Sequence, residues 1–239
     1  MAITERAART ARPQAVSLGQ GTLVTDAGCP PAVAAAYRQA FLNTRFAMLS
    51  VTGTSLLISP VDGTAAAALP AANFAILAAQ EGERVILVDA DLHAPTLDQL
   101  FSLTASPGMS ELIRHGGSDA LGALQAIDLG MSSRSNLRVL GAGRAGGIPG
   151  GIGRAPGLHD LLTCLKNEAD RLILIGTPIL SSVDSMDLSS LVAGVLVTLT
   201  PGHTHREDAA KARQVLDQVR APLLGVMLTA HAGNITPAR

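Results

Sequence analysis

The sequence predicts an α/β fold, a mainly parallel sheet with helices on both faces, and three observations carry this prediction. Short continuous apolar runs recur, as expected of parallel strands buried on both faces, at residues 84–89, 171–175, 194–199 and 223–228. Segments with helical spacing of apolar residues alternate with these runs. In residues 55–77 an apolar strand passes through a small-residue loop into a helix, which is the layout of a phosphate-binding loop.

That central stretch reads SLLISPVDGTAAAALPAANFAIL. A working phosphate loop reads GxxxxGK[ST], where the Lys reaches the terminal phosphates and the hydroxyl holds Mg²⁺. With Asn73 aligned to the Asn usual in the following helix, alanines replace the last Gly, the Lys and the hydroxyl. The candidate degenerate loop comprises Asp62, Gly63, Thr64, Ala65, Ala66, Ala67 and Ala68. An ordinary strand-to-helix turn has the same outline, so this stretch alone leaves both interpretations open.

Pro70 places the start of the following helix near residues 67–69, because proline is tolerated in a first turn and costly further in. The apolar positions Ala72, Ala75, Ile76 and Ala79 then recur at helical spacing. One face of this helix can therefore pack on the sheet.

Two carboxylates follow the strand at 84–89. Asp89 and Asp91 stand at the carboxyl end of a central strand, where open α/β sheets bind ligands. They are therefore candidates for binding the water shell of a Mg²⁺ ion, or for contacting a partner. Aspartates also cap helices and shape turns. The pair alone does not decide between a metal site and capping.

The remaining elements follow in chain order. We expect a tail over 1–30, with a basic anchor or targeting peptide as the alternative, a folded domain over 31–230 and a second tail over 231–239.

Within the domain, helical spacing begins at Pro31, and short helices are predicted at 96–101, 110–115 and 119–127. A strand at 136–140 runs into a loop of about 15 residues, because no helix opens after GAGRAGG as a dinucleotide site requires. Thr204 and Glu207 have the spacing of a capping box for a later helix.

Composition limits the function classes. The 239 residues are 47% hydrophobic, which suffices for one large domain, and 15% charged with a net charge of −1. This charge gives no electrostatic footprint for nucleic acid. Cys29 and Cys164 match neither a disulfide framework nor a zinc site, and no apolar run has the length of a membrane span. We expect a cytoplasmic protein whose membrane role comes through a partner.

Several separated stretches agree with one family. The chain resembles the cytoplasmic domain of bacterial tyrosine kinases of capsule and exopolysaccharide systems, relatives of the MinD-like and ParA-like deviant P-loop ATPases. The segment VILVDADLHAPTLDQLF carries the most specific match, and the resemblance extends over residues 32–230. It implies a P-loop fold and a place in polysaccharide synthesis or export.

The departures from the family are equally informative. The resemblance places the family's loop Lys and Ser/Thr on Ala67 and Ala68, its Walker B Asp on Gly176 and an adenine-contacting Asn on Thr229. The family's C-terminal tyrosine cluster is not found in this chain, whose one tyrosine is Tyr37. The family's first helix carries charges that join neighbouring subunits, and here Arg38 and Phe41 occupy two of those positions. Phe41 could meet a partner or belong to the core.

These losses predict a catalytically degenerate kinase-like protein that acts as a regulatory or assembly partner. We expect no cofactor, although residual binding of Mg-ATP or Mg-ADP stays open. The expected partner is a membrane polysaccharide co-polymerase or export protein that recruits the chain to the inner face of the membrane, alongside an active kinase paralogue. An active ATP-dependent tyrosine kinase of the same pathway and a ParA-like or MinD-like positioning protein are the alternatives.

Overall fold

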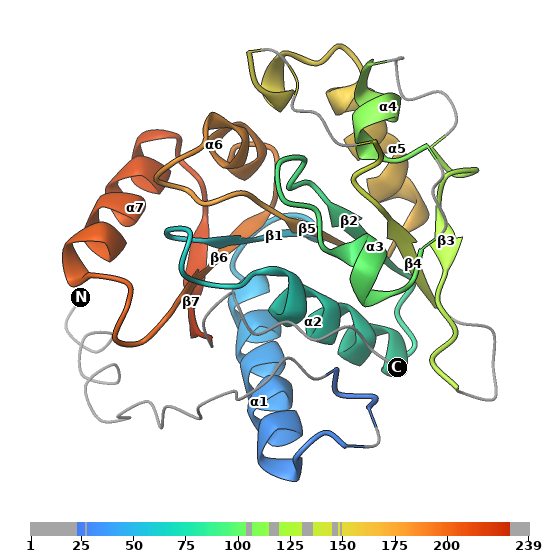
Figure 1. Cartoon of the computed structure of the whole chain (residues 1–239), viewed down its shortest axis with the longest axis horizontal. Coiled ribbons are helices and arrows are strands. Elements are labelled where there is room, and N and C mark those ends of the chain that lie inside the picture. The colour runs from blue at the N-terminus through green and yellow to red at the C-terminus, as the bar shows by residue number, and fades with distance from the viewer. Residues whose placement is uncertain are drawn as a thin grey trace.

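The structure is a computed structural model that describes residues 23–26, 28–103, 107–114, 120–130, 136–144, 148 and 150–229 (Figure 1). Residues 1–22 of the expected N-terminal tail (1–30) and the whole expected C-terminal tail (231–239) lie outside the described residues. The helices are α1 (Pro31–Met48), α2 (Ala68–Gln80), α3 (Leu97–Leu100), α4 (Met109–Arg114), α5 (Leu158–Glu168), α6 (Val183–Ser189), α7 (Arg206–Gln218) and the short 3-10 helix η2 (Ile152–Arg154). The strands are β1 (Ser55–Pro60), β2 (Val85–Asp89), β3 (Gln125–Ala126), β4 (Leu137–Leu140), β5 (Arg171–Ile175), β6 (Gly194–Leu199) and β7 (Leu223–Leu228).

The strands form one sheet in the order β3-β4-β2-β5-β1-β6-β7, parallel except for the antiparallel pair β3–β4. This confirms the predicted mainly parallel α/β fold. The central strands β1, β2 and β5 are almost wholly buried, which is why they read as continuous apolar runs. Because the parallel strands end at the same edge, the loops after them meet there.

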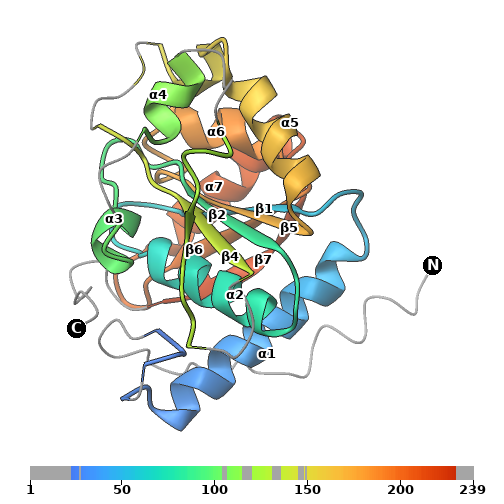
Figure 2. The same cartoon turned by 90° about the vertical axis from the view of Figure 1, so that its right-hand side faces the viewer.

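Helices cover both faces of the sheet. One core cluster joins α1, α2 and α3 to one face, and the other joins α4, α5, α6 and α7 to the opposite face, as Figures 1 and 2 show. Helix α2 is buried nearly all round, with Ala71, Ala72, Ala75, Ala78 and Ala79 at 0% exposure. Small side chains let its backbone lie close to the strands. The core therefore fixes the place of the loop that precedes α2.

Some element predictions were wrong. Residues 120–126 form a turn and the short strand β3 where a helix over 119–127 was expected, and α6 was not predicted. The capping box also fails, because His205 is the N-cap residue of α7 and makes no side-chain cap bond. The Thr204 hydroxyl instead accepts the Thr200 N–H at 3.1 Å. The side chain that matched the motif is used to close the preceding loop.

The folded part also begins before Pro31, where the sequence placed the domain boundary. Leu23 is buried, and the Val24 N–H donates to Asn73 Oδ1 at 2.8 Å. A side-chain hydrogen bond also links Asn73 with Tyr37 of α1. One buried amide thus joins three segments of the chain.

Asn73→Ala should destabilise the fold by roughly 1–3 kcal/mol, because it leaves the Val24 N–H without its acceptor and removes the hydrogen bond to the buried Tyr37. Urea unfolding followed by circular dichroism measures the loss. Asn43→Ala is the matched control, since Asn43 lies on the exposed side of α1 and bonds only Gln39 among the described residues. Equal unfolding free energies for the two variants would contradict the role of Asn73.

Candidate nucleotide-type pocket

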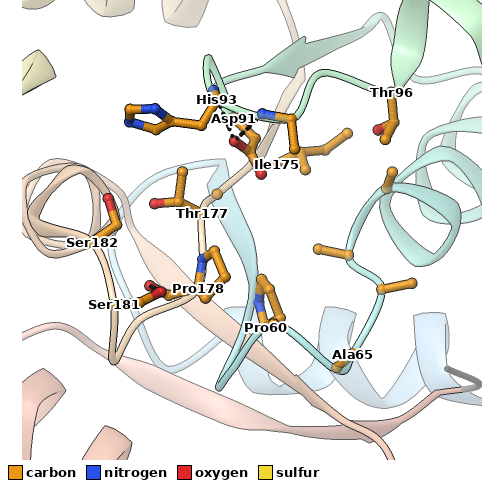
Figure 3. Close-up of a pocket in the computed structure, with 16 residues that line it drawn as sticks. Pro60, Ala65, Asp91, His93, Thr96, Ile175, Thr177, Pro178, Ser181 and Ser182 are labelled. Carbon is orange, nitrogen blue, oxygen red and sulfur yellow. Dashed lines mark hydrogen bonds between the residues drawn. The ribbon is translucent and has the colours of Figure 1, made fainter. Parts of the chain in front are cut away.

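A pocket of about 550 Å³ lies where β1, β2 and β5 end, at the edge where open α/β sheets bind ligands (Figure 3). Its wall combines the start of α2 with the loops after the three strands. The lining residues are Pro60, Gly63, Ala65, Ala66, Ala67, Ala68, Asp91, His93, Ala94, Thr96, Ile175, Gly176, Thr177, Pro178, Ser181 and Ser182. None of these lining residues is Lys or Arg. The wall therefore offers methyl groups, hydroxyls, one carboxylate and one imidazole.

Five of the seven predicted loop residues line the pocket: Gly63 and Ala65–Ala68. The N-cap residue of α2 is Ala67, which makes no side-chain cap bond. In the alignment suggested by the sequence, this residue takes the position expected of a phosphate loop's lysine. The loop runs from strand to helix as a phosphate loop does, and Ala65 to Ala68 present methyl groups to the pocket.

The other two residues, Asp62 and Thr64, do not line the pocket and tie the loop to the segment after β6. Thr64 Oγ1 lies 3.2 Å from Thr204 Oγ1, and Thr200 Oγ1 donates to the Thr64 carbonyl at 3.0 Å. Partial burial alone would raise the pKa of Asp62, but hydrogen bonds from the Thr64 hydroxyl and N–H outweigh it and lower the pKa. These two residues hold the shape of the loop.

Asp89 and Asp91 have different environments. Asp89 is fully buried, does not line the pocket, and accepts the N–H groups of Thr96 and Leu97 at 2.8 and 3.0 Å. Burial raises its pKa to about 6, against the lowering effect of these N–H donors. Asp91 lines the pocket and accepts the N–H groups of His93 and Ala94. The predicted pair is thus split, with Asp89 capping α3 and Asp91 facing the pocket.

The space beside Gly176 is filled. A Cβ there would lie 2.6 Å from Ser185 Oγ, 3.0 Å from Leu57 Cδ1 and 3.1 Å from Ser59 Cβ. Ser59, Ser185 and Thr177 form a buried hydroxyl cluster, in which Ser59 and Ser185 both donate to the Thr177 carbonyl. An acidic side chain at position 176 has no room in this arrangement.

The alignment with a phosphate loop that the sequence suggests puts Ala67 and Ala68 at the positions expected of the lysine and the hydroxyl, and both line this pocket. It puts Gly176 at the position expected of the strand-end carboxylate. Within the described ranges, no group of three His, Cys, Asp or Glu side chains is placed to hold a metal ion. Thr229, aligned with the adenine-contacting Asn, is buried and donates its N–H to the Leu199 carbonyl at 2.8 Å.

Sequence reasoning missed one contact at the pocket rim. His93 Nε2 lies 3.3 Å from Asp184 Oδ2, and the same carboxylate accepts the Ile152 N–H at 2.9 Å. It also missed the wall hydroxyls Thr96, Thr177, Ser181 and Ser182. These four residues could have been predicted from their positions, because each lies in a segment that follows a predicted strand. Asp184 gave no such signal, because α6 was not predicted.

The two candidate interaction residues lie on different sides of α1. Arg38 is exposed. Phe41 is 3% exposed and packs edge-to-face on Phe74 of α2, with ring centroids 5.6 Å apart. Phe41 is therefore a core residue, and its assignment to a partner contact is corrected.

The chain has relatives of known name. No family model matches the chain. It is 29% identical over 192 residues to the tyrosine-protein kinase YwqD of Bacillus subtilis, covering 80% of this chain and 78% of the relative. It is 23% identical to the tyrosine-protein kinase ptk of Acinetobacter johnsonii and 26% identical to the succinoglycan biosynthesis transport protein ExoP of Rhizobium meliloti. These matches cover 77% and 66% of this chain but 24% and 20% of the two relatives.

Its homologues are bacterial tyrosine kinases. Solved structures show the same fold. The kinase domain of the Escherichia coli tyrosine kinase ETK matches with a TM-score of 0.78 at 19% identity, over 97% of this chain and 89% of that one. The Pyrococcus furiosus cell division ATPase MinD matches with a TM-score of 0.55 at 20% identity, over 78% and 77%. The fold is that of the MinD-like P-loop ATPases.

The buried Asp89 predicts a pH-dependent stability. The pKa of Asp89 is about 6 in the folded protein, above its ordinary 3.8, so the folded state keeps a proton that the unfolded chain has lost. The stabilisation is complete below about pH 4 and disappears as the pH rises through 6, a change of roughly 2–3 kcal/mol. Urea unfolding at pH values from 4 to 7 should show this decline, and Asp89→Asn should remove it. Parallel curves for the two proteins would contradict the assignment.

Gly176→Asp should destabilise the fold by about 1–3 kcal/mol, because the new side chain overpacks the hydroxyl cluster. Adding Ser185→Ala should recover part of this loss, since it removes the atom at 2.6 Å. Gly63→Asp is the matched control, because a Cβ at Gly63 meets nothing within 4 Å. Unfolding free energies test the set, and a Gly176→Asp protein as stable as the Gly63→Asp protein would show that the pocket adapts freely.

Proposed function

We propose that this chain is a catalytically inactive kinase-like protein that serves as a regulatory or assembly partner in bacterial exopolysaccharide or capsule synthesis and export. The observation that carries the proposal is the lining of the pocket, where alanines occupy the positions of the lysine and the metal-binding hydroxyl and no lining residue is cationic. The relatives supply the pathway, since they include tyrosine kinases and a succinoglycan biosynthesis transport protein.

Magnitudes support the loss of catalysis. Phosphoryl transfer relies almost wholly on positioning and on preorganised charge. Removing a single preorganised group commonly lowers the rate by on the order of 10²–10³. Here the Lys, the hydroxyl and the acidic group are all replaced. Because groups that act together are not additive, we expect a loss of at least about 10⁴ rather than the full product.

The tyrosine of this chain supports the same conclusion. Tyr37 lies in α1 at 2% exposure, with its side chain hydrogen-bonded to Asn73. Burial raises its pKa to about 12. A kinase would have to unfold this part of the domain to reach the hydroxyl. We therefore propose that this chain is neither a tyrosine kinase nor, through Tyr37, a tyrosine-kinase substrate.

The proposed partner is a membrane polysaccharide co-polymerase or export protein, which would bring the chain from the cytoplasm to the inner face of the membrane. In the described part of the chain, no helix is long and apolar enough to cross a bilayer. We propose that a protein contact supplies the membrane recruitment. An active kinase paralogue would supply the phosphoryl transfer that this chain lacks.

Purified protein with Mg²⁺ and labelled ATP should show no tyrosine phosphorylation and turnover at least about 10⁴-fold below that of an intact kinase domain measured in parallel. A ligand at a hundredfold excess over its Kd would stabilise the folded protein by about 2.7 kcal/mol. Because we expect Mg-ATP to bind weakly or not at all, millimolar Mg-ATP should leave the melting temperature almost unchanged.

Asp91→Ala separates intrinsic turnover from a contaminant, since Asp91 is the carboxylate that lines the pocket. Turnover that disappears in this variant would favour an active kinase over the proposed role. If Mg-ATP raises the melting temperature by several degrees without turnover, the protein binds nucleotide but is still catalytically inactive.

A further inference from the structure

The pocket at the strand ends is surrounded by negative charge. Asp91 lines it, and none of the lining residues is Lys or Arg. Three further carboxylates stand next to the lining without belonging to it: Asp62, Asp89 and Asp184. Asp89 accepts the Asp91 N–H at 3.2 Å, and Asp184 contacts the pocket residue His93. This charge is opposite in sign to the one that favours a phosphate group.

One oxygen of Asp91 has no protein partner. Its Oδ1 accepts the N–H groups of His93 and Ala94 at 3.1 and 3.0 Å. In the described part of the chain, no donor lies within hydrogen-bond distance of its Oδ2. Figure 3 shows Asp91 on the opposite side of the pocket from Ala65. A ligand that covers this carboxylate must supply a donor, because desolvating an unpaired charge is costly.

The rest of the wall is mostly apolar. The alanine methyl groups of the loop form one side, and two prolines and an isoleucine complete it: Ala65–Ala68, Pro60, Pro178 and Ile175. The amino end of α2 lies on the alanine side, and its partial positive charge falls off within the first turn. A cationic group is therefore favoured beside Asp91, and an apolar group beside the alanines.

We propose that the pocket binds a small organic cation, a guanidinium or ammonium group on an apolar body. The cationic group donates to Asp91 Oδ2, and the body lies against Ala65–Ala68. The volume of about 550 Å³ is typical of small-molecule sites, which span about 300–1,000 Å³. The inference rests on the proposed function in one respect, namely that Mg-ATP does not occupy the pocket.

A metal ion fits this lining less well than an organic cation. Mg²⁺ requires near-octahedral coordination by oxygen, and Asp91 is the one carboxylate among the lining residues. A guanidinium group is more weakly hydrated and has flat faces that pack on apolar groups. Because only one carboxylate lines the pocket, a ligand with a single positive charge matches it best.

Phenethylguanidinium is the probe, and phenethylurea, which has nearly the same shape without the charge, is its matched control. Titration of the probe into the whole chain labelled with ¹³C at the alanine methyl groups should shift the signals of Ala65–Ala68. The shifts should saturate with a Kd of about 2 mM or below. Phenethylurea should bind at least about tenfold more weakly, because it lacks the charged hydrogen bond.

Asp91→Asn should weaken binding of the probe about tenfold and leave the circular dichroism spectrum unchanged. The amide oxygen of the new side chain can still accept the N–H groups of His93 and Ala94. Asp160→Asn is the matched control, because Asp160 is exposed on α5 and does not line the pocket. Three results would each overturn the proposal: equal affinity for the urea, unchanged affinity in Asp91→Asn, or no methyl shift at about 10 mM probe.

Two further ligands exclude other occupants. MgCl₂ alone should leave the alanine signals unchanged, and a saturable shift that is lost in Asp91→Asn would replace the proposal with a metal site. A blocked tripeptide with a central arginine should bind no more tightly than the probe. Tighter binding of the peptide would overturn the assignment to a small molecule.

The proposed function is tested separately, because turnover and phosphorylation are measured with Mg-ATP and without the probe. An inactive chain that does not bind the probe would overturn this inference alone. An active chain would overturn the proposed function.

Discussion

The burial of α2 on the sheet is the constraint on which the rest of the structure depends. A helix that is covered nearly all round must carry side chains small enough for its neighbours to approach, and its alanines at 0% exposure meet this demand. Phe74 and Ile76 fill the remaining space between the helix, α1 and the strands. Because the whole helix is held in this way, the position of its first turn at the end of β1 follows from packing alone.

The same packing holds the path of the loop that precedes α2. Ala67 and Ala68, at the end of this loop, belong to the core cluster around the helix. Contacts among Thr64, Thr200 and Thr204 tie the loop to the segment after β6. At the neighbouring strand end, the hydroxyl cluster of Ser59, Thr177 and Ser185 occupies the volume beside Gly176. The frame of the pocket is therefore stable without a ligand.

The sequence predicted the parts of the fold that depend on burial. The doubly buried strands and α2 were placed correctly because continuous apolar runs and helical spacing record their surroundings directly. It failed where long-range contacts override a local pattern: Thr204 closes a loop instead of capping α7, and residues 125–126 pair with β4 instead of forming a helix. Of the candidate site residues, five of the seven loop residues and Asp91 line the pocket, but motif spacing could not separate Asp91 from the buried Asp89. The His93–Asp184 contact joins segments about ninety residues apart and has no local signature.

The polar groups around the pocket mostly hold the protein's own backbone. Asp91 accepts two N–H groups of the loop that follows it, and Ser182 Oγ accepts the Asp184 N–H at 3.2 Å. Asp184 in turn contacts both His93 and the Ile152 N–H, so it links the pocket rim to η2. A buried carboxylate is costly unless hydrogen bonds satisfy it, and these contacts compensate the burial of Asp184. A pocket whose polar side chains are committed in this way has few groups left to reorganise around a substrate, and its shape is set by the same contacts that hold the domain together.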